Sequence, residues 1–293
     1  MLPMPHAHFL RALFYQLHEK GVTRTAFCAM AFRGGGGCLF SRWVGNGCML
    51  PGGVMLFFPI ERMKRSCVWQ EFFDGLQQAG VEELRGVLVS LAEPGYRAFA
   101  ARLLPGVQRL LGVRIPVLRE LARCLARAGW LRLETPPDAY VEEVMLRGFL
   151  IGYAGCEVGL GRRLEELEAF VPLVDNWSVC DSCCASLRFV RDCRAEVWDW
   201  VLPYVFSGCE FEARFGVVLL LDHFLQEEVW AARVAEVLPQ VPARGFYAEM
   251  ALAWCACELC LLYPAGAEGL LAALRPSVQR LARRKLRESR RWR

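Results

Sequence analysis

The chain has 293 residues, of which 55% are hydrophobic and 23% charged, and its net charge is +4. This apolar content excludes a disordered chain and suffices for one large domain or two ordinary ones. Only three of its 35 basic residues are lysines, and only one histidine, His223, follows residue 18. The pattern of a Ser-His-Asp triad or of an HExxH zinc site is not present. An enzyme that forms a Schiff base would have only three lysines available.

The first 66 residues differ from the rest in their glycine-rich composition and in their lack of a regular hydrophobic pattern. They contain the run Gly34 to Gly37 and the turn Pro51-Gly52-Gly53, without a sustained helical or strand period. We expect residues 1–66 to be a poorly ordered extension, or to reflect a misplaced translation start with Met63 or a later codon opening the working domain. The uncharged stretch 43–60 holds four glycines and two prolines, so the sequence gives little support to a membrane anchor there.

From residue 67 to residue 293 the pattern is that of successive amphipathic helices, separated by short Gly- and Pro-containing breaks. Apolar residues recur every three or four positions, and no segment needs to be a strand. Helices paired at intervals of about 35–40 residues predict an all-α fold of the HEAT/ARM-like helical-repeat solenoid type, with a compact irregular bundle as the alternative. The expected helices cover residues 81–91, 95–104, 116–128, 138–153, 162–171, 176–190, 194–206, 210–224, 228–239, 245–262 and 275–287.

The 14 cysteines do not form the pattern of a disulfide framework, because most of them lie within apolar helical segments. No signal peptide is apparent, so we expect a reducing, cytoplasmic setting. The clusters Cys180-x-x-Cys183-Cys184 and Cys255-x-Cys257-x-x-Cys260 resemble metal spacings but would need ligands from other segments. We therefore interpret them as core residues and expect neither metal nor cofactor, with a redox or metal protein as a weaker alternative.

The C-terminal segment concentrates positive charge. Residues 275–293 hold nine basic residues against Glu288, which leaves the rest of the chain acidic. Four arginines spaced three to four residues apart share one helical face, and such a row can follow a phosphate backbone. The alternative is a solvated, frayed terminal helix. The four are Arg280, Arg283, Arg284 and Arg287.

The segment from Val174 to Ser182 carries the most specific chemistry. Asp175 or Asn176 is suited to cap a helix, after which Trp177 and Asp181 lie one turn apart on the same face. An indole beside a carboxylate suits a cationic ligand. The alternative is that Trp177 anchors the core and Asp181 pairs with a neighbouring arginine.

Two later segments add candidates for the same site. Arg214 lies within a strongly apolar helix, where it could pair with Glu210 one turn earlier or reach a phosphate. Trp254 lies in another apolar helix, where it is either a core residue or an aromatic wall.

Several segments together resemble the DNA alkylation repair enzymes of the AlkD type. The resemblance spans roughly residues 80–291 in consistent order, and residues 1–66 have no counterpart in it. It is carried by residues 112–119, 142–152, 175–181, 211–221 and 250–254 and by the ending Arg287-Glu288-Ser289-Arg290-Arg291.

This resemblance implies an ARM/HEAT-like solenoid that binds duplex DNA containing alkylated bases, as a monomer and without a membrane. It implies a monofunctional DNA glycosylase of base excision repair, which hydrolyses the glycosidic bond of 3-methyladenine or 7-methylguanine without a cofactor. Trp177, Asp181 and Trp254 match the family's catalytic residues, and Arg214 matches its arginine that contacts the DNA backbone. The competing hypothesis is a helical-repeat adaptor that binds DNA or protein without catalysis.

Overall fold

The computed structural model describes residues 29–31, 47–50, 54–57, 81–242 and 244–291. From Val81 onward the described chain is all-helical, as the sequence predicts. Its helices are α3 (Val81–Ser90), α4 (Pro94–Leu103), α5 (Ile115–Arg127), α6 (Val141–Tyr153), α7 (Leu160–Phe170), α8 (Trp177–Cys184), α9 (Arg194–Val205), α10 (Glu210–His223), α11 (Glu228–Val237), α12 (Phe246–Leu262), α13 (Ala267–Ala273) and α14 (Pro276–Glu288).

Three short strands precede the helices: β1 (Ala29–Ala31), β2 (Gly47–Leu50) and β3 (Val54–Phe57). They pair antiparallel in the order β1-β3-β2. The sequence does not predict this sheet, because runs of three or four residues are too short to show a period of two. The remainder of the predicted 1–66 extension, including Met63 as a possible start, lies outside the described residues.

Every helical segment expected from the sequence is a helix in the structure. Two details were wrong. The expected helix 176–190 ends at Cys184 and continues, after a break, as the short 3-10 turn Arg188–Asp192. Helix α13 was missed, since it is only seven residues long. Among the described residues, no helix is both long and apolar enough to cross a bilayer.

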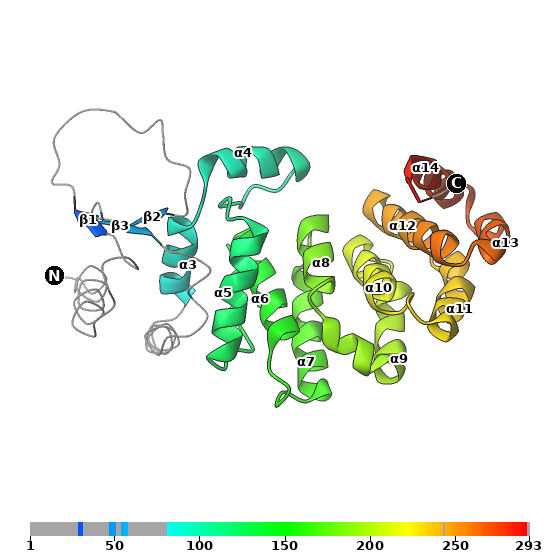
Figure 1. The fold of residues 1–293 in the computed structure, drawn as a ribbon, viewed down its shortest axis with the longest axis horizontal. Helices are drawn as coiled ribbons and strands as arrows, with labels where there is room; N and C mark the ends of the chain where they lie inside the picture. Colours follow the sequence, from blue (N-terminus) through cyan, green and yellow to red (C-terminus); the bar gives the residue numbers. More distant parts are fainter. Residues whose placement is uncertain (1–28, 32–46, 51–53, 58–80, 243, 292–293) are drawn as a thin grey trace.

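The helices form two rows. Helices α6, α8, α10, α12 and α14 pack one on the next in chain order, and α7, α9, α11 and α13 pack behind them. The array of helices curves as an arc from α3 and α4 at one end to α14 at the other (Figure 1). Alternate helices of the chain thus share the inner row, and residues from α8, α10 and α12 come together there.

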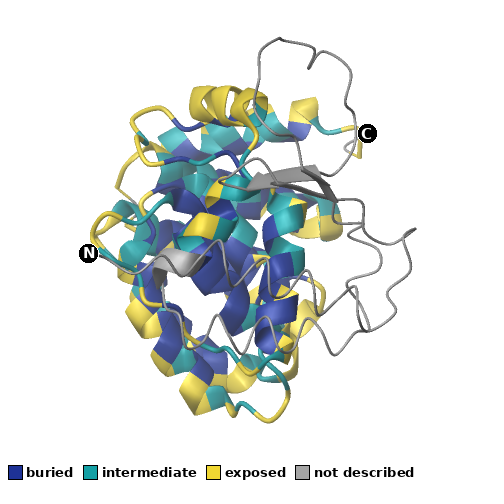
Figure 2. Ribbon diagram, turned by 90° about the vertical axis from the view of Figure 1, so that its left-hand side faces the viewer, coloured by how far each residue is buried: buried dark blue, intermediate teal, exposed yellow. Residues whose placement is uncertain are grey.

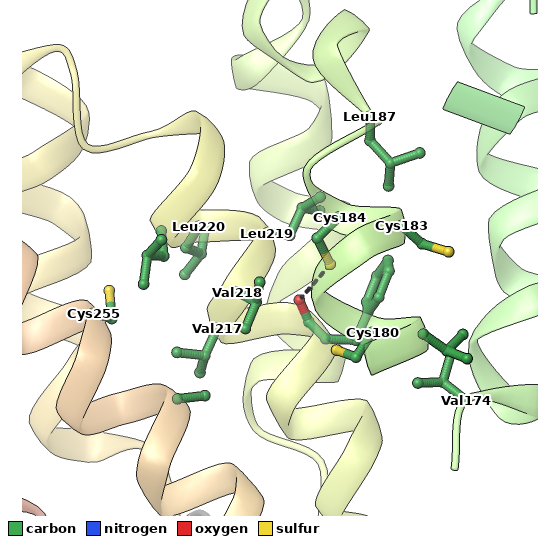
Figure 3. Packing of buried hydrophobic residues seen from close by; sticks show 14 of the residues in the cluster. Val174, Cys180, Cys183, Cys184, Leu187, Val217, Val218, Leu219, Leu220 and Cys255 are labelled. Atoms are coloured by element: carbon green, nitrogen blue, oxygen red, sulfur yellow. Dashed lines mark hydrogen bonds between the residues drawn. The ribbon is translucent and has the colours of Figure 1, made fainter. Parts of the chain in front are cut away.

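The core lies between the two rows, and its residues appear dark blue in Figure 2. Cys180 and Cys184 of α8 pack against the run Val217 to Leu220 of α10, with Cys255 of α12 beyond it (Figure 3). Close contact between α6 and α8 depends on Gly148, where an added Cβ would lie 2.4 Å from the Sγ of Cys183. Small side chains therefore bring the inner helices together.

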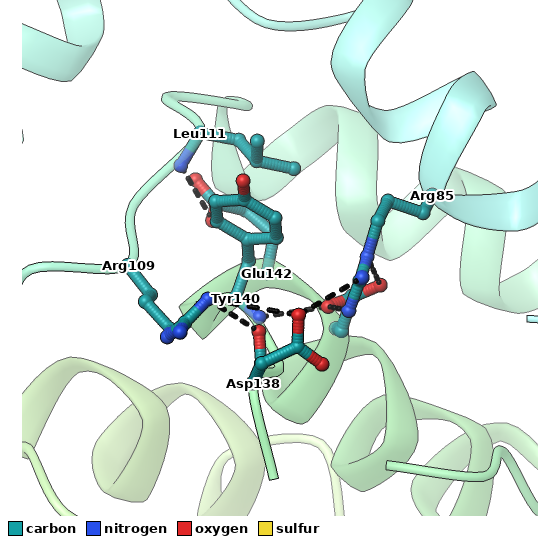
Figure 4. Close-up of polar contacts among 7 residues, drawn as sticks. Arg85, Arg109, Leu111, Asp138, Tyr140 and Glu142 are labelled. Atoms are coloured by element: carbon teal, nitrogen blue, oxygen red, sulfur yellow. Dashed lines mark hydrogen bonds and ion pairs between the residues drawn. The ribbon is translucent and has the colours of Figure 1, made fainter. Parts of the chain in front are cut away.

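A buried polar cluster fixes the first part of the helical array (Figure 4). The carboxylate of Glu142 accepts hydrogen bonds from the backbone N–H groups of Leu111, Gly112 and Val113, at 2.6 to 3.2 Å. Its neighbour Glu143 forms a bidentate pair with Arg85, at 2.9 and 3.0 Å. Both glutamates are only 2% exposed, and their hydrogen bonds hold α6 to the elements around it.

Candidate functional site

The candidate site begins at the N-terminus of α8. Asn176 is its N-cap: its Oδ1 accepts from the backbone N–H of Val179 at 3.0 Å, which satisfies a helix-end donor as the sequence predicts. Trp177 is the first helical residue, and its Nε1 donates to the carbonyl of Leu103 at 3.0 Å. The indole is partly buried where the end of α4 meets α8. Asp181 follows one turn later and is also partly exposed.

Asp181 forms a bidentate ion pair with Arg214 of α10. The Nε of Arg214 donates to Oδ1 at 2.9 Å and its Nη2 to Oδ2 at 2.7 Å. The arginine side chain is 7% exposed and the aspartate side chain 20% exposed. Planar fork geometry of this kind is among the strongest polar contacts in proteins. The carboxylate is therefore fixed in orientation while one side of it stays open to solvent.

This pair decides between the alternatives that the sequence left open. Asp181 does pair with a neighbouring arginine, and Arg214 does not pair with Glu210. A contact of Arg214 with DNA phosphate stays a prediction. In this structure the guanidinium donates to Asp181 instead. Burial lowers the pKa of Arg214, but the hydrogen bonds and charge of Asp181 raise it by more, so the guanidinium stays charged.

Arg214 also fixes the start of α12. Its Nη1 donates to the carbonyl oxygen of Tyr247 at 2.7 Å, while the N–H of Tyr247 donates to Oε1 of Glu210 at 2.6 Å. Both backbone groups of one residue are thus held by two side chains of α10 that lie one turn apart. Gly245 precedes this clamp with a φ of +100°, and an added Cβ there would lie 2.4 Å from the carboxyl carbon of Glu210.

Three aromatic rings adjoin the clamp, and sequence reasoning missed their role. Phe211 and Tyr247 are stacked, with ring centroids 5.3 Å apart and planes at 30°. Phe246 meets Tyr247 edge to face at 5.4 Å and is 65% exposed. The available signal was the dipeptide Phe246-Tyr247 directly after a glycine at a helix start. This dipeptide indicates an aromatic cluster only when α10 is known to lie beside α12, because Phe211 comes from α10.

Trp254 is the third predicted catalytic residue. It lies two turns after Tyr247 on α12 and lines an open hollow of about 230 Å³ between α12 and α14, together with Glu258, Lys285 and Glu288. Among the described residues, Trp254 makes no ring contact with Trp177. Of the predicted site residues, Asp181 and Arg214 are in direct contact, and Trp177 lies on the same helix as Asp181. A second indole wall at Asp181 stays a prediction.

Asp222 and His223 lie at the C-terminal end of α10. Burial, together with the charge of Asp181, raises the pKa of Asp222 to about 7, against the opposing effects of Arg191 and Arg119. Burial lowers the pKa of His223 to about 4. Its ring lies 2.8 Å from the carbonyl of Cys184 through Nε2, and its Nδ1 accepts from Arg191 at 3.3 Å. His223 is therefore a neutral structural residue.

The four arginines predicted to bind DNA from α14 differ in whether they form ion pairs within the chain. Val278, Ala282 and Leu286 face the core, which leaves Arg280 and Arg287 exposed on the opposite side. Within the described part of the chain, neither has an ion-pair partner. The other two predicted DNA contacts are paired: Arg283 with Glu268 and Arg284 with Glu288, both at 2.8 Å.

The cysteine clusters pack as the sequence analysis expected. The six cysteines of the two clusters are buried. Burial raises the pKa of the Cys183 and Cys184 thiols and raises that of Cys260 to about 11, so these groups stay protonated. The described residues contain no group of three His, Cys, Asp or Glu side chains placed to hold a metal ion.

Comparisons with models of known protein families, with curated proteins and with solved structures find no match to this chain.

Proposed function

We propose that this protein is a monofunctional DNA glycosylase that removes cationic alkylated purines from duplex DNA. The observation that carries the proposal is Asp181, a partly exposed carboxylate held in one orientation by a buried guanidinium, one turn after Trp177. The arc of paired helices supports a HEAT/ARM-like solenoid that presents this carboxylate on its inner row.

The chemistry fits the residues available. A purine methylated at N3 or N7 already carries positive charge, so it leaves without a general acid, and His223 is not needed. As the glycosidic bond breaks, positive charge develops on the deoxyribose. A carboxylate fixed near that sugar stabilises the transition state and orients the attacking water, and one such group is typically worth about 10²–10³ in rate.

The ion pair with Arg214 determines how strongly Asp181 attracts a cationic sugar at different distances. A neutral pair attracts a distant cation weakly, because the two charges cancel at long range. A sugar on the exposed side of Asp181 is close to the carboxylate and farther from the guanidinium, so attraction survives at contact distance. The fork also prevents reorientation of the carboxylate, which is the preorganisation that electrostatic catalysis requires.

A non-catalytic adaptor is the second candidate, and one observation favours it. Asp181 and Arg214 satisfy each other within the chain, as a purely structural pair does. In that case the inner row binds DNA or protein, and Asp181 only joins α8 to α10.

A base-release assay tests the proposal. The full chain is incubated with methylated duplex DNA without added metal, and free 7-methylguanine and 3-methyladenine are measured. We expect release by the wild-type protein and a loss of about 10²–10³ in rate for Asp181→Asn. No release by a folded wild-type protein would leave the adaptor as the explanation.

A matched control separates chemistry from stability. Asp181→Asn leaves Arg214 with a neutral partner and destabilises the fold by about 1–3 kcal/mol. Glu143→Gln weakens another bidentate pair away from the site, that of Glu143 with Arg85, and also the cap that Glu143 makes to the N–H of Tyr140. We expect Glu143→Gln to lower the melting temperature comparably and to keep full base release. Equal loss of release by both variants would contradict a catalytic role for Asp181.

A further inference from the structure

Phe246 is an exposed aromatic residue on a rigid support. The residue is 65% exposed, although burial of such a ring is worth about 1.5–3 kcal/mol. Its backbone lies between Gly245, whose φ is +100°, and Tyr247, whose N–H and carbonyl are held by Glu210 and Arg214. The ring is thus presented to solvent on a backbone that cannot easily withdraw it.

The rings behind Phe246 connect it to the candidate site. Tyr247 supports Phe246 edge to face, and Phe211 stacks on Tyr247. Arg214 joins Tyr247 to Asp181 through hydrogen bonds of 2.7 to 2.9 Å. Phe246 therefore occupies the solvent end of a continuous set of contacts that begins at the carboxylate.

The loop that leads into Phe246 carries one arginine and is contacted by a second. Arg244, two residues earlier, is exposed and, within the described residues, makes no ion pair. Arg275 approaches the same loop, and its Nη1 donates to the carbonyl of Pro242 at 2.6 Å. The nearby carboxylates Glu210 and Asp181 are already engaged with Tyr247 and Arg214. An exposed aromatic ring two residues after an exposed arginine matches a nucleotide, which offers a base to stack and a phosphate to pair.

We infer that Phe246, supported by Tyr247 and Phe211, is a stacking platform for an unpaired nucleobase, and that Arg244 binds the adjacent phosphate. The inference deepens the proposed function, since it rests on DNA as the ligand. It adds that the protein contacts an unstacked base next to its site. A base paired within an intact duplex offers its edges and not its face, so the platform discriminates between paired and unpaired DNA.

The test measures binding and not base release. The probe is a DNA duplex with one bulged 2-aminopurine, whose fluorescence falls when the base stacks on an aromatic ring. The comparison probe is the same sequence fully paired. We expect the wild-type full chain to bind the bulged probe more tightly and to quench it. We expect Phe246→Ala to lose this quenching and to bind the bulged probe about 5- to 100-fold more weakly, with little change for the paired probe.

Two further variants sharpen the result. Phe206→Ala removes another exposed ring, at the end of α9, and is expected to change neither affinity nor quenching. Arg244→Gln is expected to reduce the salt dependence of binding by about one phosphate contact and to keep the quenching. Unchanged binding and quenching in Phe246→Ala would overturn the inference, as would equal wild-type affinity for both probes.

These outcomes are separable from the proposed catalysis. A protein that releases methylated bases, but whose Phe246→Ala variant binds the bulged probe normally, keeps the glycosylase proposal and loses the platform. A protein that quenches the probe through Phe246 but releases no base keeps the platform and loses the glycosylase proposal.

Discussion

At the scale of single residues, the neighbours Asp222 and His223 respond to burial in opposite directions. Burial and the charge of Asp181 raise the pKa of Asp222 from 3.8 to about 7, and burial lowers that of His223 from 6.5 to about 4. Asp222 therefore contributes stability that is complete below about pH 4 and lost as the pH rises to about 7. His223 contributes stability that is complete above about pH 6.5 and lost as the pH falls towards 4.

We predict that Asp222→Asn changes how stability depends on pH. Removal of the buried charge stabilises the variant over the wild type by at most about 4 kcal/mol above pH 7, and the difference disappears near pH 4. Because the opposing slope of Asp222 is gone, the variant also gains stability from about pH 4 to 6.5, as His223 loses its proton in the unfolded chain. Urea unfolding at about pH 4, 6 and 8 measures both effects.

The exposed Asp199 of α9 provides the control for this prediction. Asp199→Asn removes the same charge without a burial cost, so we expect little change at any pH. A stability difference for Asp222→Asn that stays constant across the range would show that burial does not raise the pKa of Asp222.

At the scale of elements, the junction of α10 with α12 determines the geometry of the site. The two helices meet where Glu210 and Arg214 clamp Tyr247, and the chain enters α12 through Gly245. Only glycine adopts a φ of +100° without strain, and an added Cβ would also collide with the Glu210 carboxyl group.

We therefore predict that Gly245→Ala destabilises the protein by about 1–3 kcal/mol. Gly269→Ala is the matched control: Gly269 lies within α13 with open space around its Cα, so alanine there is neutral or stabilises the helix by up to about 1 kcal/mol. Thermal unfolding of both variants checks the pair. A Gly245→Ala variant as stable as Gly269→Ala would mean that the loop before α12 relaxes freely.

At the scale of the whole molecule, positive charge is concentrated at the C-terminal end of the arc. Arg280 and Arg287 face solvent from α14 without an ion-pair partner in the described chain, whereas Arg283 and Arg284 are engaged by Glu268 and Glu288. Paired arginines must first leave their carboxylates to bind a phosphate. Arg280 and Arg287 are therefore the stronger of the four proposed DNA contacts.

We predict that the double variant Arg280→Gln/Arg287→Gln weakens DNA binding and reduces the slope of log affinity against log salt by about two. Arg123→Gln/Arg127→Gln on α5 removes equal charge elsewhere and is expected to leave the slope almost unchanged. Binding of labelled duplex DNA over a range of salt concentrations measures both. Equal slopes in all three proteins would place α14 away from DNA.

The local pattern of the chain was sufficient to predict nearly all the helices and a helix cap at Asp175 or Asn176, of which Asn176 is the cap. A period near 3.6 and a capping side chain act over a few neighbouring residues, so they can be read without knowledge of the fold. The scarcity of histidine and lysine likewise limited the available chemistry. The three strands and α13 were not predicted, since each is too short to show a period.

The partner of Arg214 could be decided only by the tertiary structure. Asp181 and Arg214 are 33 positions apart, and no local rule prefers this pair over the one with Glu210 one turn away. Packing of α10 between α8 and α12 brings the guanidinium to Asp181 and Tyr247 and leaves Phe246 in solvent. Such pairings depend on which faces of distant helices meet, and burial makes an unmatched charge there too costly to leave.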